Sequence, residues 1–194
     1  YEIDSGEISI DGINIKDYKL SNLRKNIGIV LQDVFLFSDT IFNNITLKDE
    51  SISLNEVKLA AKQIGVHDFI MSLPNNYYYN VKERGIMLSS GQRQLIAFLR
   101  VYVSDPQILI LDEATSSIDS TSEVLIQNAT EKLTKNRTSL IIAHRLATIK
   151  KANNIIVMDS GNIIEQGSHK ELISNMDGYY KKLYDVQFQV KNVS

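Results

Sequence analysis

Hydrophobic residues follow two patterns along this chain, short runs and longer stretches in which they recur at helical spacing. The mostly apolar runs lie at 27–31, 108–111 and 139–143. Such runs predict strands buried on both faces, as in a parallel sheet covered by helices. Apolar residues three or four positions apart follow Ser53, Gly91 and Ser120, and they predict amphipathic helices. The alternation of these segments predicts an α/β fold with a mostly parallel sheet flanked by helices.

Polar residues mark where several of these segments begin. The spacing Ser-x-x-Glu, which allows a serine and a glutamate to cap a helix start reciprocally, begins at Ser53, Ser120 and Ser168. The pair Asp11-Gly12 and the triplet at 159–161 predict tight hairpin turns. These signals predict a hairpin-type turn near each end of the chain.

Composition restricts the class of protein. The chain has 194 residues, of which 43% are hydrophobic and 23% are charged, as is ordinary for a globular protein with one substantial core. A net charge of −2 provides no basic field, so we expect no nucleic-acid partner. No stretch approaches the ~20 apolar residues that span a bilayer, so we expect no direct membrane insertion. His67 lacks a partner pattern and is interpreted as a surface or packing residue, whereas His169 lies in the first turn of a predicted capped helix and is interpreted as solvated.

Two chemical features lie one predicted helix apart. The turn at 88–92, Leu-Ser-Ser-Gly-Gln, opens into a helix, and free N–H groups at a helix start suit an anion such as phosphate. The strand at 108–111 is followed by Asp112 and Glu113. Acids in that position lie at the carboxyl edge of a sheet, where open α/β folds bind ligands. Taken alone, such an acid pair is equally compatible with the start of a solvated loop.

Together the two features resemble the signature and Walker B motifs of ATP-binding-cassette (ABC) ATPases. The resemblance implies a P-loop-NTPase-like fold with an inserted α-helical signature subdomain, and ATP and Mg²⁺ as cofactors. It assigns Mg²⁺ binding to Asp112 and activation of the attacking water to Glu113, which agrees with phosphoryl-transfer chemistry. In this family the signature turn holds the phosphate of an ATP bound to a second subunit. That role falls on Ser89, Ser90, Gly91 and Gln92, where Ser90 replaces the usual glycine.

Three further segments resemble family motifs in the same order along the chain. Gln32 corresponds to the Q-loop glutamine, which reaches Mg²⁺ and the attacking water. Asp119 ends the segment 116–119, which resembles the D-loop at the dimer interface. His144 corresponds to the switch histidine that contacts the γ-phosphate. We therefore expect Gln32, Glu113 and His144 to be catalytic, with three strand ends converging on one sheet edge.

Two segments point to an exporter rather than an importer. The apolar residues 34–37 follow Gln32, and we favour a contact with a partner helix over burial in the core. Residues 83–85, Glu-Arg-Gly, resemble the segment before the signature in exporter-type cassettes. The resemblance implies a second nucleotide-binding domain and a transmembrane domain as partners, at the cytoplasmic face of the cell membrane.

The largest departure from the family is a missing motif. None of the 194 residues form the Gly-x-x-x-x-Gly-Lys-Ser/Thr loop that cradles phosphates, and we expect that an N-terminal segment was lost. Residues 1–48 and 105–194 are then predicted to form the ATPase core, and 49–104 the helical subdomain. The intact parent is expected to hydrolyse ATP and drive export, and the isolated chain to be inactive. The alternatives are a silent dimerisation or regulatory module and a non-transport cassette.

Overall fold

The computed structural model describes residues 3–113, 120–143 and 146–191, with side chains omitted at 113, 120–121, 146–147 and 187–191. It divides the chain into two compact units, residues 1–142 and 143–194. Each unit has its own hydrophobic cluster.

The first unit begins with the predicted hairpin. Strands β1 (Ser9–Ile10) and β2 (Ile13–Asn14) pair antiparallel across a turn in which Asp11 and Gly12 both have positive φ. This conformation is the one that favours an Asp-Gly pair. A 3₁₀ turn (Ile15–Asp17) and helix α1 (Leu20–Asn26) then lead directly into the central sheet.

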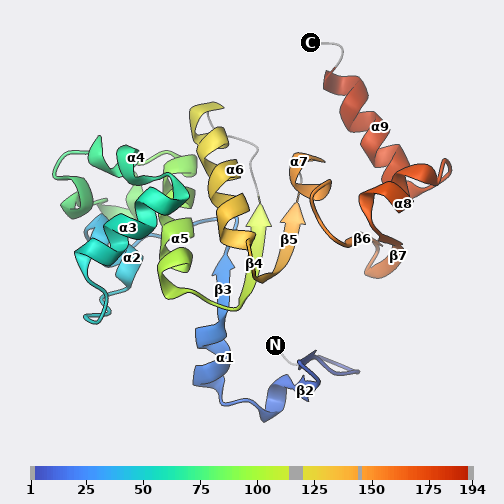
Figure 1. Cartoon of the computed structure of the whole chain (residues 1–194), viewed down its shortest axis with the longest axis horizontal. Helices are drawn as coiled ribbons and strands as arrows, with labels where there is room; N and C mark the ends of the chain where they lie inside the picture. The colour runs from blue at the N-terminus through green and yellow to red at the C-terminus, as the bar shows by residue number, and fades with distance from the viewer. Residues whose placement is uncertain (1–2, 114–119, 144–145, 192–194) are drawn as a thin grey trace. The chain divides into compact units, whose positions relative to one another are not determined.

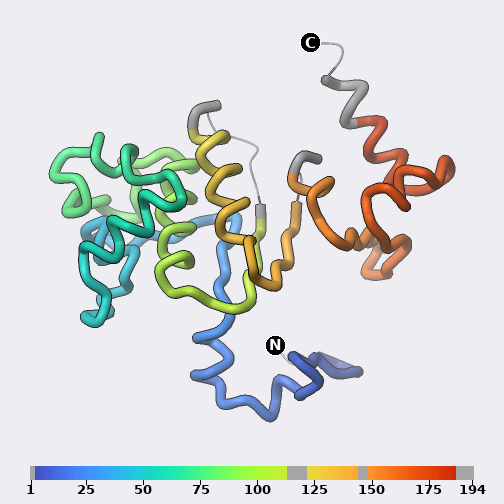
Figure 2. Tube along the Cα trace, in the orientation of Figure 1, coloured from blue at the N-terminus to red at the C-terminus, as the bar shows by residue number. Residues whose placement is uncertain are grey.

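The central sheet has the strand order β3-β4-β5. Its members are β3 (Ile27–Val30), β4 (Ile108–Glu113) and β5 (Thr138–Ala143). Strands β3 and β4 are parallel, with Val30 opposite Leu111, although the chain between them is long (Figure 2). The three arrows point the same way in Figure 1. The predicted α/β fold with a parallel sheet is therefore confirmed.

One face of this sheet is buried by helices, which corrects the prediction that both faces are covered. Helix α5 (Ser90–Ser104) packs on β3, and Val30, Leu109 and Leu111 are buried. On the other face of the sheet, the side chain of Ile29 is 51% exposed and that of Leu140 is 57% exposed. Unbroken apolar sequence gives no indication of which face is covered, because both faces carry the same residue types.

Between β3 and α5 the chain forms mainly helices. These are α2 (Ile41–Thr46), α3 (Leu54–Ile64) and α4 (His67–Met71), followed by 3₁₀ turns at Asn76–Tyr78 and Glu83–Gly85. Ser53 and Glu56 cap α3 reciprocally, and Gly65 ends it at φ 83°, as predicted. Helix α2 was not predicted. His67 packs as one alternative anticipated, with its Nδ1 2.9 Å from the hydroxyl of the buried Tyr77.

Helix α6 (Ser120–Thr134) follows β4 and packs on α5. Its buried stripe consists of Ile126, Ala129 and Leu133, which have the helical spacing predicted after Ser120. The first unit therefore has one continuous core that runs from the sheet through α5 to α3. No helix in the part of the chain that the structure describes is long and apolar enough to cross a membrane.

The described residues of the second unit form a hairpin and three helices. Helix α7 (Leu146–Ile149) precedes strands β6 (Ile155–Asp159) and β7 (Asn162–Gly167), which are followed by α8 (His169–Ser174) and α9 (Tyr179–Lys191). The predicted solvation of His169 is wrong, because its Nδ1 lies 2.7 Å from the hydroxyl of Tyr180. In α9, Tyr180 is buried, whereas Leu183 is 59% exposed.

Candidate functional site

Helix α5 begins with a reciprocal cap at the signature turn (residues 88–92). The hydroxyl of Ser89 accepts a hydrogen bond from the backbone N–H of Gln92 at 3.2 Å. The side-chain oxygen of Gln92 accepts in return from the N–H of Ser89 at 3.0 Å. The turn therefore opens into a helix, as predicted. The Ser-x-x-Gln spacing also predicts a reciprocal helix cap, a signal that the interpretation as a phosphate-binding motif does not use.

The capped turn suits a phosphate chemically. Ser89 and Ser90 are exposed, and the first turn of α5 directs N–H groups and the positive end of the helix dipole outward. The Ser89 hydroxyl keeps its own proton for a further acceptor, because the bond from Gln92 uses only a lone pair. Ser90 has no positive φ, so the serine in place of a glycine causes no backbone strain.

Arg93 supports this turn from within the helix. Its Nη1 donates to the carbonyl oxygen of Leu88 at 2.7 Å. A Cβ placed on Gly85 would lie 3.2 Å from Cδ of Arg93, and Gly85 has φ +69°. Only glycine adopts this conformation readily and also leaves room for the arginine stem. Sequence reasoning did not identify Arg93, because the bond that it makes depends on the folded turn.

Two predicted Mg²⁺ ligands lie at the same edge of the sheet. Gln32 is exposed and follows β3, and Asp112 is half-buried near the end of β4. Because β3 and β4 are parallel neighbours in register, both residues lie at the carboxyl edge. A carboxylate and an amide oxygen are ligands that Mg²⁺ accepts. Among the described residues no three His, Cys, Asp or Glu side chains come together at one point.

Three predicted site residues fall at the limits of the described chain. Glu113 is the last residue of β4, and its side chain is outside the described set. Asp119 and His144 lie outside the described residues. Strand β5 ends at Ala143 beside β4, so the residue after it follows a strand of the same sheet. The convergence of His144 with the other two strand ends stays a prediction.

The loop after Gln32 exposes two aromatic rings. In this phenylalanine loop (residues 33–39), Phe35 is 54% and Phe37 52% exposed. The two rings meet edge to face with centroids 5.1 Å apart. Leu36 between them is completely buried, and Val34 packs against the core. The prediction of an exposed contact surface is therefore wrong for Leu36, because adjacent residues in this extended loop point to opposite sides.

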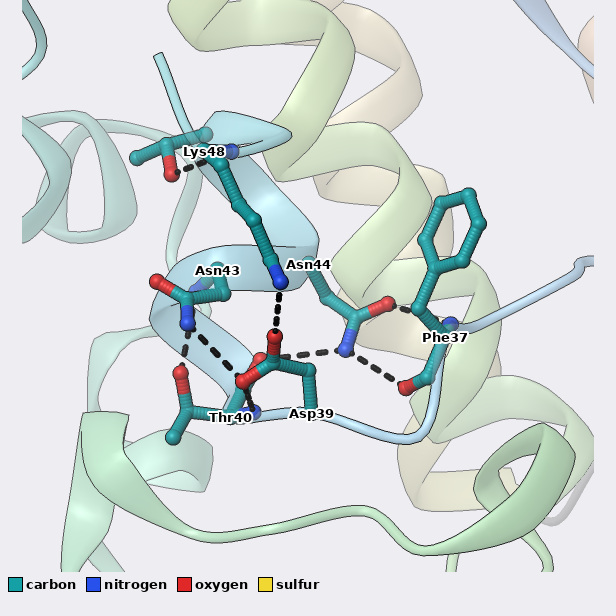
Figure 3. Close-up of polar contacts among 7 residues, drawn as sticks. Phe37, Asp39, Thr40, Asn43, Asn44 and Lys48 are labelled. Atoms are coloured by element: carbon teal, nitrogen blue, oxygen red, sulfur yellow. Dashed lines mark hydrogen bonds and ion pairs between the residues drawn. The ribbon is translucent and has the colours of Figure 1, made fainter. Parts of the chain in front are cut away.

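A polar cluster holds the end of the phenylalanine loop (Figure 3). The carboxylate of Asp39 accepts from the N–H of Thr40 at 2.7 Å and from Nδ2 of Asn43 at 2.8 Å, and it pairs with Lys48 at 3.0 Å. These donors lower the pKa of Asp39 from 3.8 to about 2, with the Thr40 N–H contributing most. The buried Asn44 bonds to both backbone groups of Phe37. No sequence signal had indicated this cluster.

A comparison with protein families supplies a decisive observation. The profile of the family described as ABC transporter matches residues 1–116, more than half of the chain. The chain belongs to the ABC transporter family. This confirms the resemblance drawn from the signature and Walker B motifs, which lie at 88–92 and 108–113 within the matched region.

Curated ABC transporter relatives match nearly the whole chain. A candidate multidrug export ATP-binding/permease protein of Staphylococcus aureus strain NCTC 8325 is 50% identical over 187 residues. A relative of the same name from the bovine strain RF122 is 49% identical over 187 residues. Each alignment covers 96% of this chain and 32% of the relative. The chain thus spans about a third of the length of these relatives.

A solved ABC transporter structure has the same fold. It is described as a bacterial Atm1-family ABC exporter with ATP bound. The TM-score is 0.86 and the identity 41%, over 96% of this chain and 32% of the solved chain. Relatives and neighbour are both named as exporters, in agreement with the exporter-type resemblance of residues 34–37 and 83–85.

Proposed function

We propose that the chain is the ATP-binding and ATP-hydrolysing part of an ABC exporter. The observation that carries this proposal is the pairing of β3 with β4, which puts Gln32 and Asp112 at one sheet edge. Helix α5, which carries the capped signature turn, packs on that same sheet. A sheet edge with oxygen ligands suits a metal ion, and a helix start with N–H donors suits a phosphate, so the chain carries both kinds of group that a pair of such domains needs to bind metal–phosphate complexes.

The signature turn binds the phosphate of an ATP held by a second nucleotide-binding domain. Ser89 contributes its hydroxyl proton, and Ser90 and Gly91 contribute the dipole and N–H groups of the first turn. Gln92 orients Ser89 through the reciprocal cap. The two domains associate head to tail, with Asp119 at their interface. The 194 residues contain no Lys-bearing phosphate loop, so we expect the isolated chain to bind ATP weakly and to be inactive.

The sheet edge supplies the hydrolytic groups. Asp112 and Gln32 hold Mg²⁺, which when bound neutralises charge on the phosphate oxygens. Glu113 accepts a proton from the attacking water, and Gln32 orients that water. His144, which follows β5 in the sequence, donates to the γ-phosphate. Each of these roles is positioning or electrostatic, as phosphoryl transfer requires.

Phe35 and Phe37 contact a transmembrane domain, together with the segment at residues 83–85. Two neighbouring phenylalanines that are each about half exposed make an apolar contact surface beside the catalytic Gln32. The chain accordingly acts at the cytoplasmic face of a membrane.

Residues 49–104 form the helical subdomain of the chain, and residues 1–48 together with 105–194 form its ATPase core.

The test is ATP hydrolysis by the full-length protein that contains this chain, reconstituted in lipid vesicles. Glu113→Gln is expected to reduce phosphate release about 10²–10⁴-fold, the usual contribution of a general base. The matched control is Glu50→Gln, which changes an exposed glutamate outside the site and should leave the rate unchanged. Full activity of Glu113→Gln would contradict the catalytic assignment. Absence of hydrolysis in the wild type would favour the silent dimerisation module.

A further inference from the structure

One buried amide fixes the backbone of the phenylalanine loop. The Oδ1 atom of Asn44 accepts from the N–H of Phe37 at 2.8 Å, and its Nδ2 donates to the carbonyl of Phe37 at 3.0 Å (Figure 3). The same Nδ2 donates to the carbonyl of Thr40 at 3.0 Å. Asn44 is fully buried, so water cannot replace these bonds. The side chain of Asn44 therefore fixes both backbone polar groups of Phe37, the residue whose ring is exposed.

Arg100 of helix α5 connects this arrangement to the signature helix. Its Nε donates to the carbonyl of Asn44 at 2.8 Å, and its Nη2 donates to the carbonyl of Phe35 at 3.4 Å. Arg100 is half-buried, and this burial lowers the pKa of its guanidinium. A planar guanidinium that bonds two carbonyls fixes their relative position. Arg100 thus joins α5 to residues 56 and 65 positions earlier in the chain.

The phenylalanine loop is also attached to the segment that enters the signature turn. The N–H of Val81 donates to the carbonyl of Asp39 at 3.1 Å, and the N–H of Ile41 donates to that of Tyr79 at 3.0 Å. Leu36 is buried so close to Gly85 that a Cβ there would lie 3.0 Å from its Cδ1. The contact between Leu36 and Gly85 therefore lies close to the signature turn, because Gly85 shortly precedes residues 88–92.

We propose that Asn44 and Arg100 are positioning residues that join the phenylalanine loop and helix α5 into one rigid body. Force applied to Phe35 and Phe37 then moves the signature turn, since an α-helix transmits displacement along its axis with little bending. The distance along α5 from Arg100 to Ser89 is roughly 16 Å at 1.5 Å per residue. Neither residue is assigned any contact with ATP. The origin of the force, a transmembrane domain, rests on the proposed function.

The experiment measures whether the two parts move together. The chain contains no cysteine, so Ser38→Cys and Met87→Cys, both at exposed positions, give a clean pair of spin-label sites. Pulsed electron paramagnetic resonance then reports the distribution of distances between loop and turn. The protein that carries only the two cysteine substitutions, called the parent of the variants below, should give one narrow distribution of distances. Arg100→Leu and Asn44→Leu should each broaden it to roughly twice its width or split it, because the loop then samples separate positions.

Two variants serve as controls for this measurement. Arg100→Lys retains one donor and should restore part of the narrow distribution, which distinguishes positioning from simple filling of space. Arg137→Leu removes another arginine that bonds a helix carbonyl, that of Leu133, and its further contacts, with Asp105 and the ring of Tyr102, lie at the end of α5 away from the signature turn. This variant should leave the distribution unchanged. Circular dichroism verifies folding of each variant. If Arg100→Leu does not fold, Arg100→Lys carries the test, and a width equal to that of the parent would overturn the proposal.

Hydrogen exchange provides a second readout of the same arrangement. The amide of Phe37 donates to Asn44, so Asn44→Leu should lower its protection about tenfold, as expected for the loss of one hydrogen bond. Arg100→Leu should lower it as well if the two residues act together. Unchanged exchange and unchanged distances in both variants would overturn the proposal. Neither readout depends on ATP hydrolysis. A full-length protein that does not hydrolyse ATP would therefore refute the proposed function without affecting this test.

Discussion

Ser89 and Gln92 cap one another at the start of helix α5, with hydrogen bonds of 3.2 and 3.0 Å between side chain and backbone in each direction. The two residues therefore have a structural role that is independent of any ligand. They also occupy the positions through which the signature turn would hold a phosphate. A substitution of Ser89 or Gln92 can therefore change both the stability of the protein and its activity. Its effect must be compared with that of the same substitution in a helix cap for which no ligand is proposed.

Ser89→Ala is expected to lower both stability and ATP hydrolysis. Loss of the N-cap should reduce the free energy of unfolding by about 1 kcal/mol. The matched control is Ser53→Ala, which removes the corresponding cap of α3, where Ser53 and Glu56 bond in the same way. Thermal unfolding and phosphate release by the full-length protein measure the two effects. Equal loss of activity in both variants would refute a ligand role for Ser89.

Gly28→Ala is expected to destabilise the sheet through overpacking. A Cβ at Gly28 would lie 2.6 Å from Cγ of Pro106 and 2.7 Å from Cγ1 of Val101. Contacts this close force the helix away from the strand, at a cost of about 1–3 kcal/mol. The double variant Gly28→Ala with Val101→Ala should be less destabilised than the sum of the single variants, because the second change removes one clash. Additive effects in urea unfolding would show that the helix contact is not the cause.

Local patterns predicted the elements whose signals lie within a few residues. The reciprocal cap at Ser53 and Glu56 and the turn at Asp11 and Gly12 both formed as predicted. Burial was harder to predict, because it depends on what packs against a strand. Ile29 is exposed and Val30 buried, although both belong to one apolar run. The run identified the strand but could not identify the covered face.

The candidate site shows the same division. The signature turn and the acid at 112 were found because their residues are adjacent in sequence. The bond between Arg100 and Asn44 joins positions 56 residues apart, and no local spacing indicates it. His169 and Tyr180 likewise meet only when α8 and α9 have folded together. Motif reading therefore located candidate ligand-binding residues and missed the residues that hold them in position.

Tyr77 and His67 are expected to stabilise the helical region jointly. The hydroxyl of Tyr77 is 2.9 Å from Nδ1 of His67, and burial raises the pKa of Tyr77 to about 12. Tyr77→Phe leaves the imidazole without this partner and should cost about 1 kcal/mol. A double-mutant cycle with His67→Phe, measured by urea unfolding, should show that the two changes are not additive. Strict additivity would mean that the short contact contributes nothing to stability.

The pH dependence of Asp39 should be visible in acid unfolding. Its pKa is lowered from 3.8 to about 2 by the N–H of Thr40, then Asn43, then Lys48. A lowered pKa means that the native state favours the carboxylate. Its contribution to the free energy of unfolding is therefore complete above about pH 4 and is lost as the pH falls toward 2. Asp39→Asn should remove this part of the pH dependence.

The comparison with Lys48→Gln distinguishes the causes of this shift. Lys48 contributes the third-ranked hydrogen bond and a weaker Coulombic attraction, so its removal should raise the pH of the acid transition but leave the contributions of Thr40 and Asn43 in place. The chain has no tryptophan, so circular dichroism in urea at fixed pH values between 2 and 6 is the appropriate measurement. If Lys48→Gln removed as much of the pH dependence as Asp39→Asn, the exposed ion pair would be the dominant cause. That result would contradict the assignment to the Thr40 N–H at 2.7 Å.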